Sequence, residues 1–191
     1  MLGRCSRGYT LMEALISLGL IFMIVFAISA LALGFSRYQT IRLERSLVQE
    51  NFRNTVSIIA AEVRGKSVRD ILEPMNAMSF ELYMRGRNNT IIRYHAVRNV
   101  GSIESQVFRK VYNVPEMHRP INQTNWAANK DKIIGTPASP ITPREVEPVS
   151  DKIRAISHIL FTHKHGVAIF ITGEMYNKTR VSYVSLVFPR N

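Results

Sequence analysis

Cysteine is nearly missing from this chain, which has one, Cys5, among 191 residues. A single cysteine excludes an intramolecular disulfide and a cluster of cysteine metal ligands. When a membrane-length segment is set aside, roughly 150 residues remain, a common size for one domain. The sequence therefore predicts a domain that is held together by its hydrophobic core alone.

Charge is missing from Ala14 to Ser36, a run of 23 residues. A helix of about 20 apolar residues spans a bilayer core. A cleaved secretory signal would be shorter and would end in small residues, whereas this run ends in Gly34-Phe35-Ser36-Arg37. A lipoprotein signal would need its cysteine after the apolar stretch, and Cys5 precedes it. The run is therefore expected to remain in the protein as a membrane segment.

Acidic residues are the scarcer charge, 14 against 25 lysines and arginines, which gives a net charge of +11. One interpretation is a solvated basic surface. The other is a surface that meets an anion such as DNA, lipid headgroups or an acidic partner. Composition leaves both interpretations open.

One acid, Glu13, stands at the start of the apolar run. A carboxylate at the centre of a membrane helix costs about 2.5–3.5 kcal/mol, and less near an end. On a helix its neighbours three or four residues away are Tyr9, Thr10, Ile16 and Ser17, none of which is cationic. We therefore expect its partner to be a chain terminus or another molecule.

These residues carry a family resemblance. Arg7-Gly8-Tyr9-Thr10-Leu11-Met12-Glu13, followed by the uncharged run, resembles the processing motif of bacterial type IV prepilins and type II secretion pseudopilins. The resemblance implies that a prepilin peptidase cuts after Gly8 and that the new first residue, Tyr9, is N-methylated. Most family members have phenylalanine at that position. Glu13 then matches the glutamate at the fifth position of the mature chain, which serves in assembly.

Beyond the membrane segment, no proline occurs before Pro74. Apolar residues recur at helical spacing, so the sequence predicts one long helix from about Tyr9 to about Arg69, half in lipid and half packed on a head. Two helices separated by a turn around residues 34–38 are the alternative. The apolar stripe comprises Leu43, Leu47, Phe52, Val56, Ile59 and Val63.

Strand-like runs follow from Met78 onward. A hairpin is predicted from 79–83 and 90–97, with a turn at 84–89, and a third strand at 106–112. Segment 114–150 is rich in proline and polar residues, and is expected to be a long irregular loop with a short helix near 125–131. Three more strands are predicted, over 156–162, 167–172 and 181–188.

The expected fold is α+β, a long N-terminal helix packed on an antiparallel β-sheet head, which is the pilin-like layout. Its parts are a cleaved leader (1–8), a transmembrane and filament-core helix (9–36) and a globular head (37–191). Residues 49–64 and the terminal 186–191 are similar to J-type minor pseudopilins, to minor type IV pilins and to competence pseudopilins. Major pilins usually have proline where Ala30 stands, so the resemblance favours a low-abundance minor subunit.

The resemblance implies a bacterial cytoplasmic membrane protein that crosses once, with its head outside the cytoplasm, and later joins a filament. The implied partners are other minor and major pilins or pseudopilins and the prepilin peptidase. Two alternatives stay open. One is a DNA-binding minor pilin for DNA uptake, because Tyr94, Phe108, Tyr112 and Trp126 alternate with basic residues. The other is a plain membrane-anchored binding domain.

No catalytic, cofactor or metal site is predicted, and we expect no enzyme. His163 and His165 stand two residues apart at a predicted turn, where Glu174 or His158 could complete a metal site. Two solvent-exposed turn histidines are the simpler interpretation. The spacing of Ser, His and Asp residues does not suggest a catalytic triad.

Overall fold

The computed structural model describes residues 10–73, 78–98, 104–150, 155–163, 166–175 and 178–190. The chain divides into two compact units, Met1–Leu43 and Glu44–Asn191. The first unit holds the apolar part of a long helix. The second unit, the head, holds the rest of that helix, both sheets and both hydrophobic clusters.

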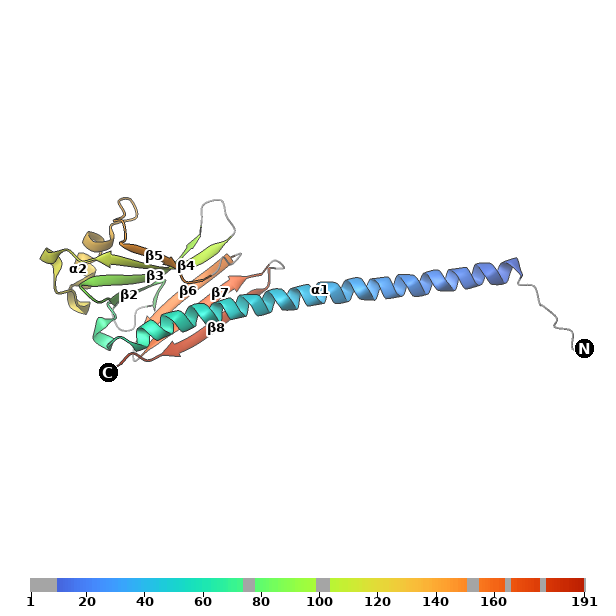
Figure 1. Cartoon of the computed structure of the whole chain (residues 1–191), viewed down its shortest axis with the longest axis horizontal. Helices are drawn as coiled ribbons and strands as arrows, with labels where there is room; N and C mark the ends of the chain where they lie inside the picture. Colours follow the sequence, from blue (N-terminus) through green and yellow to red (C-terminus); the bar gives the residue numbers. More distant parts are fainter. Residues whose placement is uncertain are drawn as a thin grey trace, which may run out of the picture. The chain divides into compact units, whose positions relative to one another are not determined.

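Helix α1 runs without interruption over Leu11–Arg64 and is drawn in blue to cyan in Figure 1. It is helical throughout 34–38, so the prediction of one helix is confirmed and the alternative of a turn there is wrong. The helix ends five residues before the expected Arg69. There the Gly65 N–H turns back to the Glu62 carbonyl (3.1 Å), and a short 3₁₀ helix, η1 (Val68–Asp70), follows.

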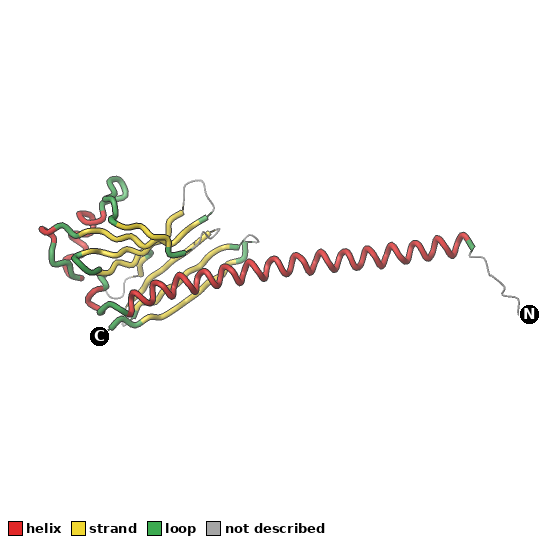
Figure 2. The backbone as a smooth tube through the Cα atoms, viewed as in Figure 1, coloured by secondary structure: helices red, strands yellow, loops and turns green. Residues whose placement is uncertain are grey.

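Two antiparallel sheets make up the strands of the described residues, whereas the sequence predicted one (Figures 1 and 2). The first sheet has the order β2-β3-β4-β5, with bounds Glu81–Arg85, Thr90–Arg98, Ser105–Asn113 and Glu145–Pro148. The second has the order β1-β6-β7-β8, with bounds Met78–Ser79, Ala155–His163, Val167–Glu174 and Arg180–Val187. The six predicted strands are confirmed. They divide between two sheets, since β4 pairs with β3 and β5 whereas β6 pairs with β1 and β7.

The predicted hairpin closes through a turn that suits its residues. Asn88 and Asn89 have positive φ angles of 53° and 56°, a conformation that asparagine adopts more readily than most residues. The Gly86 N–H donates to the Thr90 carbonyl (2.7 Å). The turn therefore fixes the register of β2 against β3.

Segment 114–150 is not the irregular loop that the sequence predicted. It contains η2 (Glu116–His118), the twelve-residue helix α2 (Gln123–Ile134) and strand β5. Asn122 caps α2 by accepting from the Asn125 N–H (2.9 Å), and Asn125 Oδ1 accepts from the Asn122 N–H (2.8 Å). The helix is longer than the expected 125–131 because this reciprocal cap starts it earlier and Ile133 and Ile134 extend it.

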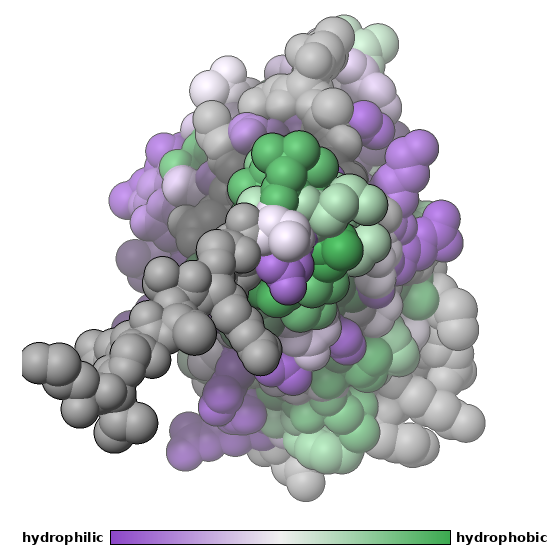
Figure 3. All heavy atoms as spheres, turned by 90° about the vertical axis from the view of Figure 1, so that its right-hand side faces the viewer, coloured by the Kyte–Doolittle hydropathy of each residue, from purple (hydrophilic) through white to green (hydrophobic). Residues whose placement is uncertain are grey.

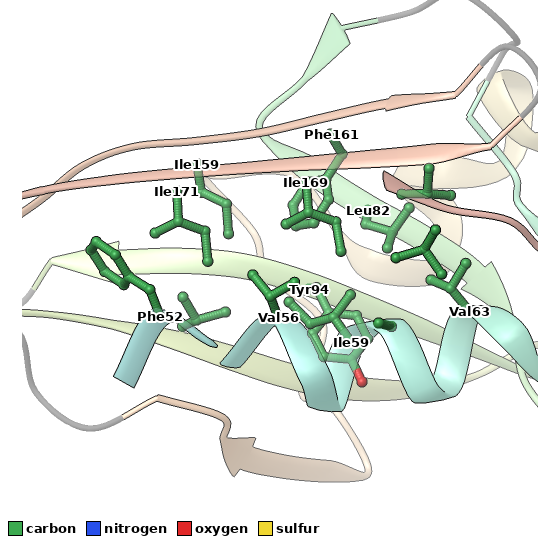
Figure 4. Close-up of a cluster of buried hydrophobic side chains, with 14 of the residues drawn as sticks. Phe52, Val56, Ile59, Val63, Leu82, Tyr94, Ile159, Phe161, Ile169 and Ile171 are labelled. Atoms are coloured by element: carbon green, nitrogen blue, oxygen red, sulfur yellow. The ribbon is translucent and has the colours of Figure 1, made fainter. Parts of the chain in front are cut away.

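The second half of α1 packs against both sheets. Phe52, Val56, Ile59 and Val63 are at most 3% exposed and face Leu82 and Tyr94 of the first sheet and the second-sheet residues Ile159, Phe161, Ile169 and Ile171 (Figure 4). The predicted stripe is wrong at its start, because Leu43 and Leu47 are 64% and 66% exposed. Val48 packs against the cluster instead. Positions 48, 52, 56, 59 and 63 repeat every three or four residues, so they share one helix face.

The first sheet is covered on both faces. Leu82, Ile92 and Tyr94 point to the α1 side, while their neighbours Tyr83, Ile91 and Tyr112 belong to a second cluster with Trp126 and Ile133 of α2. Successive side chains of a strand point to opposite faces, and this alternation sorts the residues between the two clusters. The sheet thus separates an α1 side from an α2 side.

We predict that Ile59→Ala lowers the free energy of unfolding of the head by about 2–5 kcal/mol, because it leaves a cavity at a fully buried site. Ile58→Ala is the matched control on the next position of the same helix. Ile58 is 49% exposed, so the control should lose less than about 1 kcal/mol. Chemical denaturation of the full chain in nonionic detergent measures both. Equal losses would contradict the assignment of the packed face.

Candidate assembly site at the start of helix α1

Glu13 lies in the first turn of α1 and takes part in a capping box with Thr10. The Thr10 N–H donates to Glu13 Oε2 (3.0 Å), and the Glu13 N–H donates to Thr10 Oγ1 (3.3 Å). The Thr10 hydroxyl also lies 3.2 Å from the same carboxylate oxygen. This reciprocal pattern satisfies two backbone donors that the start of a helix otherwise leaves unpaired.

The capping box corrects part of the sequence interpretation. Glu13 does have a hydrogen-bonding partner in its own segment, which the spacing Thr-x-x-Glu could have revealed. It still has no cationic partner among the residues that the structure describes. Both hydrogen bonds to the carboxylate reach Oε2, and Oε1 accepts no hydrogen bond from the residues that the structure describes. One carboxylate oxygen is therefore left for a further donor.

Two of the predicted site residues, Gly8 and Tyr9, lie outside the described residues, as does the whole leader 1–8. The described chain begins at Thr10. That is one residue after the first residue expected in the mature protein.

The uncharged run 14–36 is entirely helical and entirely exposed in its unit. Its 23 residues would extend about 35 Å at 1.5 Å per residue, more than the roughly 30 Å of a bilayer core. Green, hydrophobic residues gather on the end of this helix that faces the viewer in Figure 3. The Ser29 hydroxyl donates to the Val25 carbonyl (2.8 Å), so this polar group is satisfied within the helix. Helix α1 is thus long enough and apolar enough to span a membrane.

The other half of α1 is tied to the first sheet by a polar cluster. Arg109 of β4 binds Glu62 in a bidentate manner, with Nε to Oε2 at 3.0 Å and Nη2 to Oε1 at 3.1 Å. The Tyr94 hydroxyl donates to the same Glu62 carboxylate. Arg109 also reaches Glu147 of β5 at 3.2 Å. We call Glu62, Tyr94, Arg109 and Glu147 the helix–sheet lock.

The charges of this lock stabilise one another. Burial alone would raise the pKa of Glu62, but the hydrogen bonds from Arg109 and Tyr94, together with the charge of Arg109, hold that pKa below its usual value. The hydrogen bond to Glu62 raises the pKa of Arg109, although burial opposes this. The pair therefore remains ionised at neutral pH and holds α1 to the sheet.

The aromatic and basic residues considered for DNA binding do not form one surface. Tyr94, Tyr112 and Trp126 are at most 3% exposed, so their rings are not free to stack on bases. Arg109 is on the α1 side of the sheet and is occupied by Glu62. Arg93 and Lys110 are directly opposite each other in register and lie on the α2 side. The alternation reflects the two covered faces of the sheet.

The histidine pair gives no metal site that can be described. His165 lies outside the described residues, and so do the side chains of His158 and His163. The described part of the chain contains no group of three or more His, Cys, Asp or Glu side chains that could hold a metal ion.

Comparisons with protein-family models, with curated proteins and with solved structures find no match for this chain. The arguments on function therefore depend on its own residues and their arrangement.

We predict that Arg109→Met lowers the free energy of unfolding by about 2 kcal/mol at pH 7. Removing one partner of a buried pair costs up to 3–5 kcal/mol, and the one-fifth exposure of both side chains reduces that figure. Glu62 contributes its stability above its unfolded pKa of 4.5, and this contribution is lost as the pH falls through its lower folded pKa. In the variant, Glu62 is buried without the arginine, so its pKa is raised. Protonation of Glu62 at low pH then removes an unpaired buried charge from the variant, whereas in the wild type it breaks the ion pair with Arg109.

The difference in the free energy of unfolding between the wild type and Arg109→Met should therefore shrink as the pH falls from 7 to below 4.5. Denaturation curves recorded at several pH values measure it. Arg144→Met is the matched control, since Arg144 is 55% exposed and pairs with Glu145 at 3.4 Å. A difference that does not depend on pH would show that Arg109 acts through packing alone.

Proposed function

We propose that this chain is a minor pilin or pseudopilin, a structural subunit of a type IV pilus or a type II secretion filament. One combination of features carries the proposal. A basic leader ends at Gly8, an acid follows at Glu13, and an uncharged helix of membrane length comes directly after it. Because the cut would precede the hydrophobic segment, the segment would stay in the mature protein.

Before assembly, the uncharged part of α1 would hold the subunit in the bacterial cytoplasmic membrane, with the head outside the cytoplasm. Its apolar side chains are exposed in their own unit, so they require cover by lipid or by other chains. In a filament, the same side chains would pack against the corresponding helices of neighbouring subunits. One segment thus serves in both environments.

Glu13 would pair with the methylated α-amino group of a neighbouring subunit's first residue. The capping box occupies Oε2, and Oε1 remains for such a donor. Both charges are costly in an apolar surrounding unless they are paired, so the pairing would favour one axial position between subunits. The capping box supports this role by holding the carboxylate at the start of the helix.

A place at the filament tip or in initiation agrees with the composition of the helix. Ala30 stands where major pilins usually have proline, and α1 is regular through that position. Proline in a helix interior removes a hydrogen bond and bends or breaks the helix. An unbroken helix therefore favours a minor subunit over the main repeating one.

The first test is processing. In bacterial cells with an active prepilin peptidase, mass spectrometry of the extracted protein should find Tyr9 as the first residue, carrying an N-methyl group. Gly8→Ala should leave the uncleaved precursor, because the residue before the cut would gain a side chain. Gly3→Ala, in the same leader, is the matched control and should be processed normally. An intact Met1 in the unmodified protein would contradict the proposal and favour a plain membrane anchor.

The second test separates the two roles of Glu13. Glu13→Gln retains an acceptor for the Thr10 N–H but loses the charge, whereas Glu13→Val loses both. If charge pairing drives assembly, both variants should be cleaved after Gly8, and both should enter filaments at least about tenfold less, which corresponds to about 1.4 kcal/mol. Quantitative blotting of sheared filaments measures this. Normal incorporation of Glu13→Gln would show that the helix cap alone is needed.

A further inference from the structure

A cavity of about 590 Å³ opens on the α2 side of the first sheet. Its floor is a row of three residues that are opposite one another in register, Tyr83 of β2, Arg93 of β3 and Lys110 of β4. Lys130 and Ile134 of α2 contribute from one side. The segment 135–143, with three prolines, forms the remaining wall. Three strands, one helix and one loop segment thus converge on one hollow in the head.

The wall segment is held in place by a close backbone approach. Gly135 has a φ of 80°, and a Cβ at this position would lie 2.4 Å from both the Ile141 nitrogen and the Ser139 oxygen. The Ile141 N–H donates to the Ile134 carbonyl (3.1 Å). The segment is therefore folded back on the end of α2, and the cavity is a formed feature of the head.

Three cationic and two acidic side chains line this cavity, and a third acid, Glu73, lies beside one of the lysines. Arg93, Lys110 and Lys130 face two carboxylates, Glu81 and Asp131. Glu81 is already occupied, since it binds the Arg93 guanidinium and accepts from the Tyr83 hydroxyl. Lys130 lies 3.8 Å from Glu73 and 4.4 Å from the centre of the Tyr83 ring. Among the described residues, Lys110 of β4 has no carboxylate within ion-pair distance and no aromatic ring beneath its ammonium group.

Lys110 makes no hydrogen bond and no ion pair within the described residues. It is directly opposite Arg93, and like charges in that position on neighbouring strands destabilise a sheet. The Arg93 Nε is also buried without a hydrogen-bonding partner in the described structure. Burial lowers the pKa of Lys110, and the charge of Arg93 lowers it further, against a smaller opposing effect of Glu81. Lys110 therefore lacks an acceptor within the described residues, whereas the Arg93 guanidinium is bound to Glu81 through Nη2 and only its Nε lacks one.

A second cavity, of about 440 Å³, opens on the α1 side. Its central cation, Arg109, is occupied by Glu62, and Arg144 is paired with Glu145. Lys66 and Arg87 also line that cavity, so these two pairs neutralise only part of its charge. Two cations directly opposite each other in register, Arg93 and Lys110, are found at the cavity on the α2 side.

We propose that the cavity under α2 binds the anionic group, a carboxylate or a phosphate, of a small organic ligand. Lys110 and Arg93 would donate to the anion, and Lys130 would close over it from α2. Ile141 and the prolines of segment 135–143 would contact the apolar part of the ligand. An anion between Lys110 and Arg93 would replace their mutual repulsion by two charge-assisted hydrogen bonds. The proposal is independent of the filament function.

The test follows the seven lysines of the full chain in nonionic detergent. Reductive methylation with carbon-13 gives each lysine a resonance and keeps its charge, and single Lys→Arg variants assign the peaks. Inorganic phosphate and acetate are titrated separately near pH 7, with chloride replaced so that ionic strength stays constant. The proposal expects saturable shifts at Lys110 and Lys130 with a Kd of the order of 1 mM, and none at Lys132. The anion with the lower Kd, phosphate or acetate, identifies the class of anionic group that the cavity prefers.

Variants make the result specific. Lys110→Gln should weaken the response of Lys130 at least about tenfold, whereas Lys132→Gln, on the same helix but away from the cavity, should leave it unchanged. Unchanged resonances of the other lysines show that each variant is folded. Equal shifts at all lysines, shifts that do not saturate, or a Lys130 response that survives Lys110→Gln would each overturn the proposal.

Discussion

The burial of one face of α1 is the constraint on which the head depends. Phe52, Ile59 and Val63 are fully buried, and they contact residues of both sheets at once. Without this helix face, the inner sides of the two sheets would expose a large apolar surface to water. The helix is therefore the common core element of the head, and it is also the element that continues into the uncharged run.

This arrangement gives the two halves of α1 opposite requirements. Within the head, the apolar stripe is covered by strands, and Glu62 on a neighbouring face is held by Arg109. In the uncharged run, apolar residues surround the whole helix, so no face is reserved for contact with a sheet. A helix that is apolar on all sides suits a membrane or the interior of a helical bundle. The change of pattern between Ser36 and Val48 thus marks a change of environment.

Much of the fold could be predicted from periodicity. The strands β2 to β4 and β6 to β8 were found by alternation and turn residues, because these signals are local. Leu43 and Leu47 were assigned to the wrong face because several apolar stripes cross this part of the helix. From Leu47 to Phe52 the helix turns well past one full turn, whereas from Val48 to Phe52 the side chains nearly align. Only the packed sheets decide between the two stripes.

The missed elements have other causes. In α2, Trp126 and Ile133 are separated by mostly polar residues, so the apolar signal is weak, and the cap at Asn122 was the better indication. Strand β5 is exposed throughout, and it is defined by pairing with β4 rather than by its own composition. The capping box of Glu13 is readable from the Thr-x-x-Glu spacing, and its bonds come from a backbone N–H and a hydroxyl rather than from a cation. The cavity next to Lys110 was not predictable, since it requires α2 and segment 135–143 to fold back over distant strands.

The two faces of the first sheet show how the same residue types reach different states. Arg109 and Lys110 are neighbours in β4, so they point to opposite faces. Arg109 meets a carboxylate from α1 and another from β5, and its charge is neutralised within the head. Lys110 meets Arg93 and an already occupied Glu81. The charge of Lys110 is thus without an ion pair within the described residues, which a folded chain tolerates at some cost in stability. Its presence in a formed cavity is accounted for if the missing counter-charge belongs to a ligand.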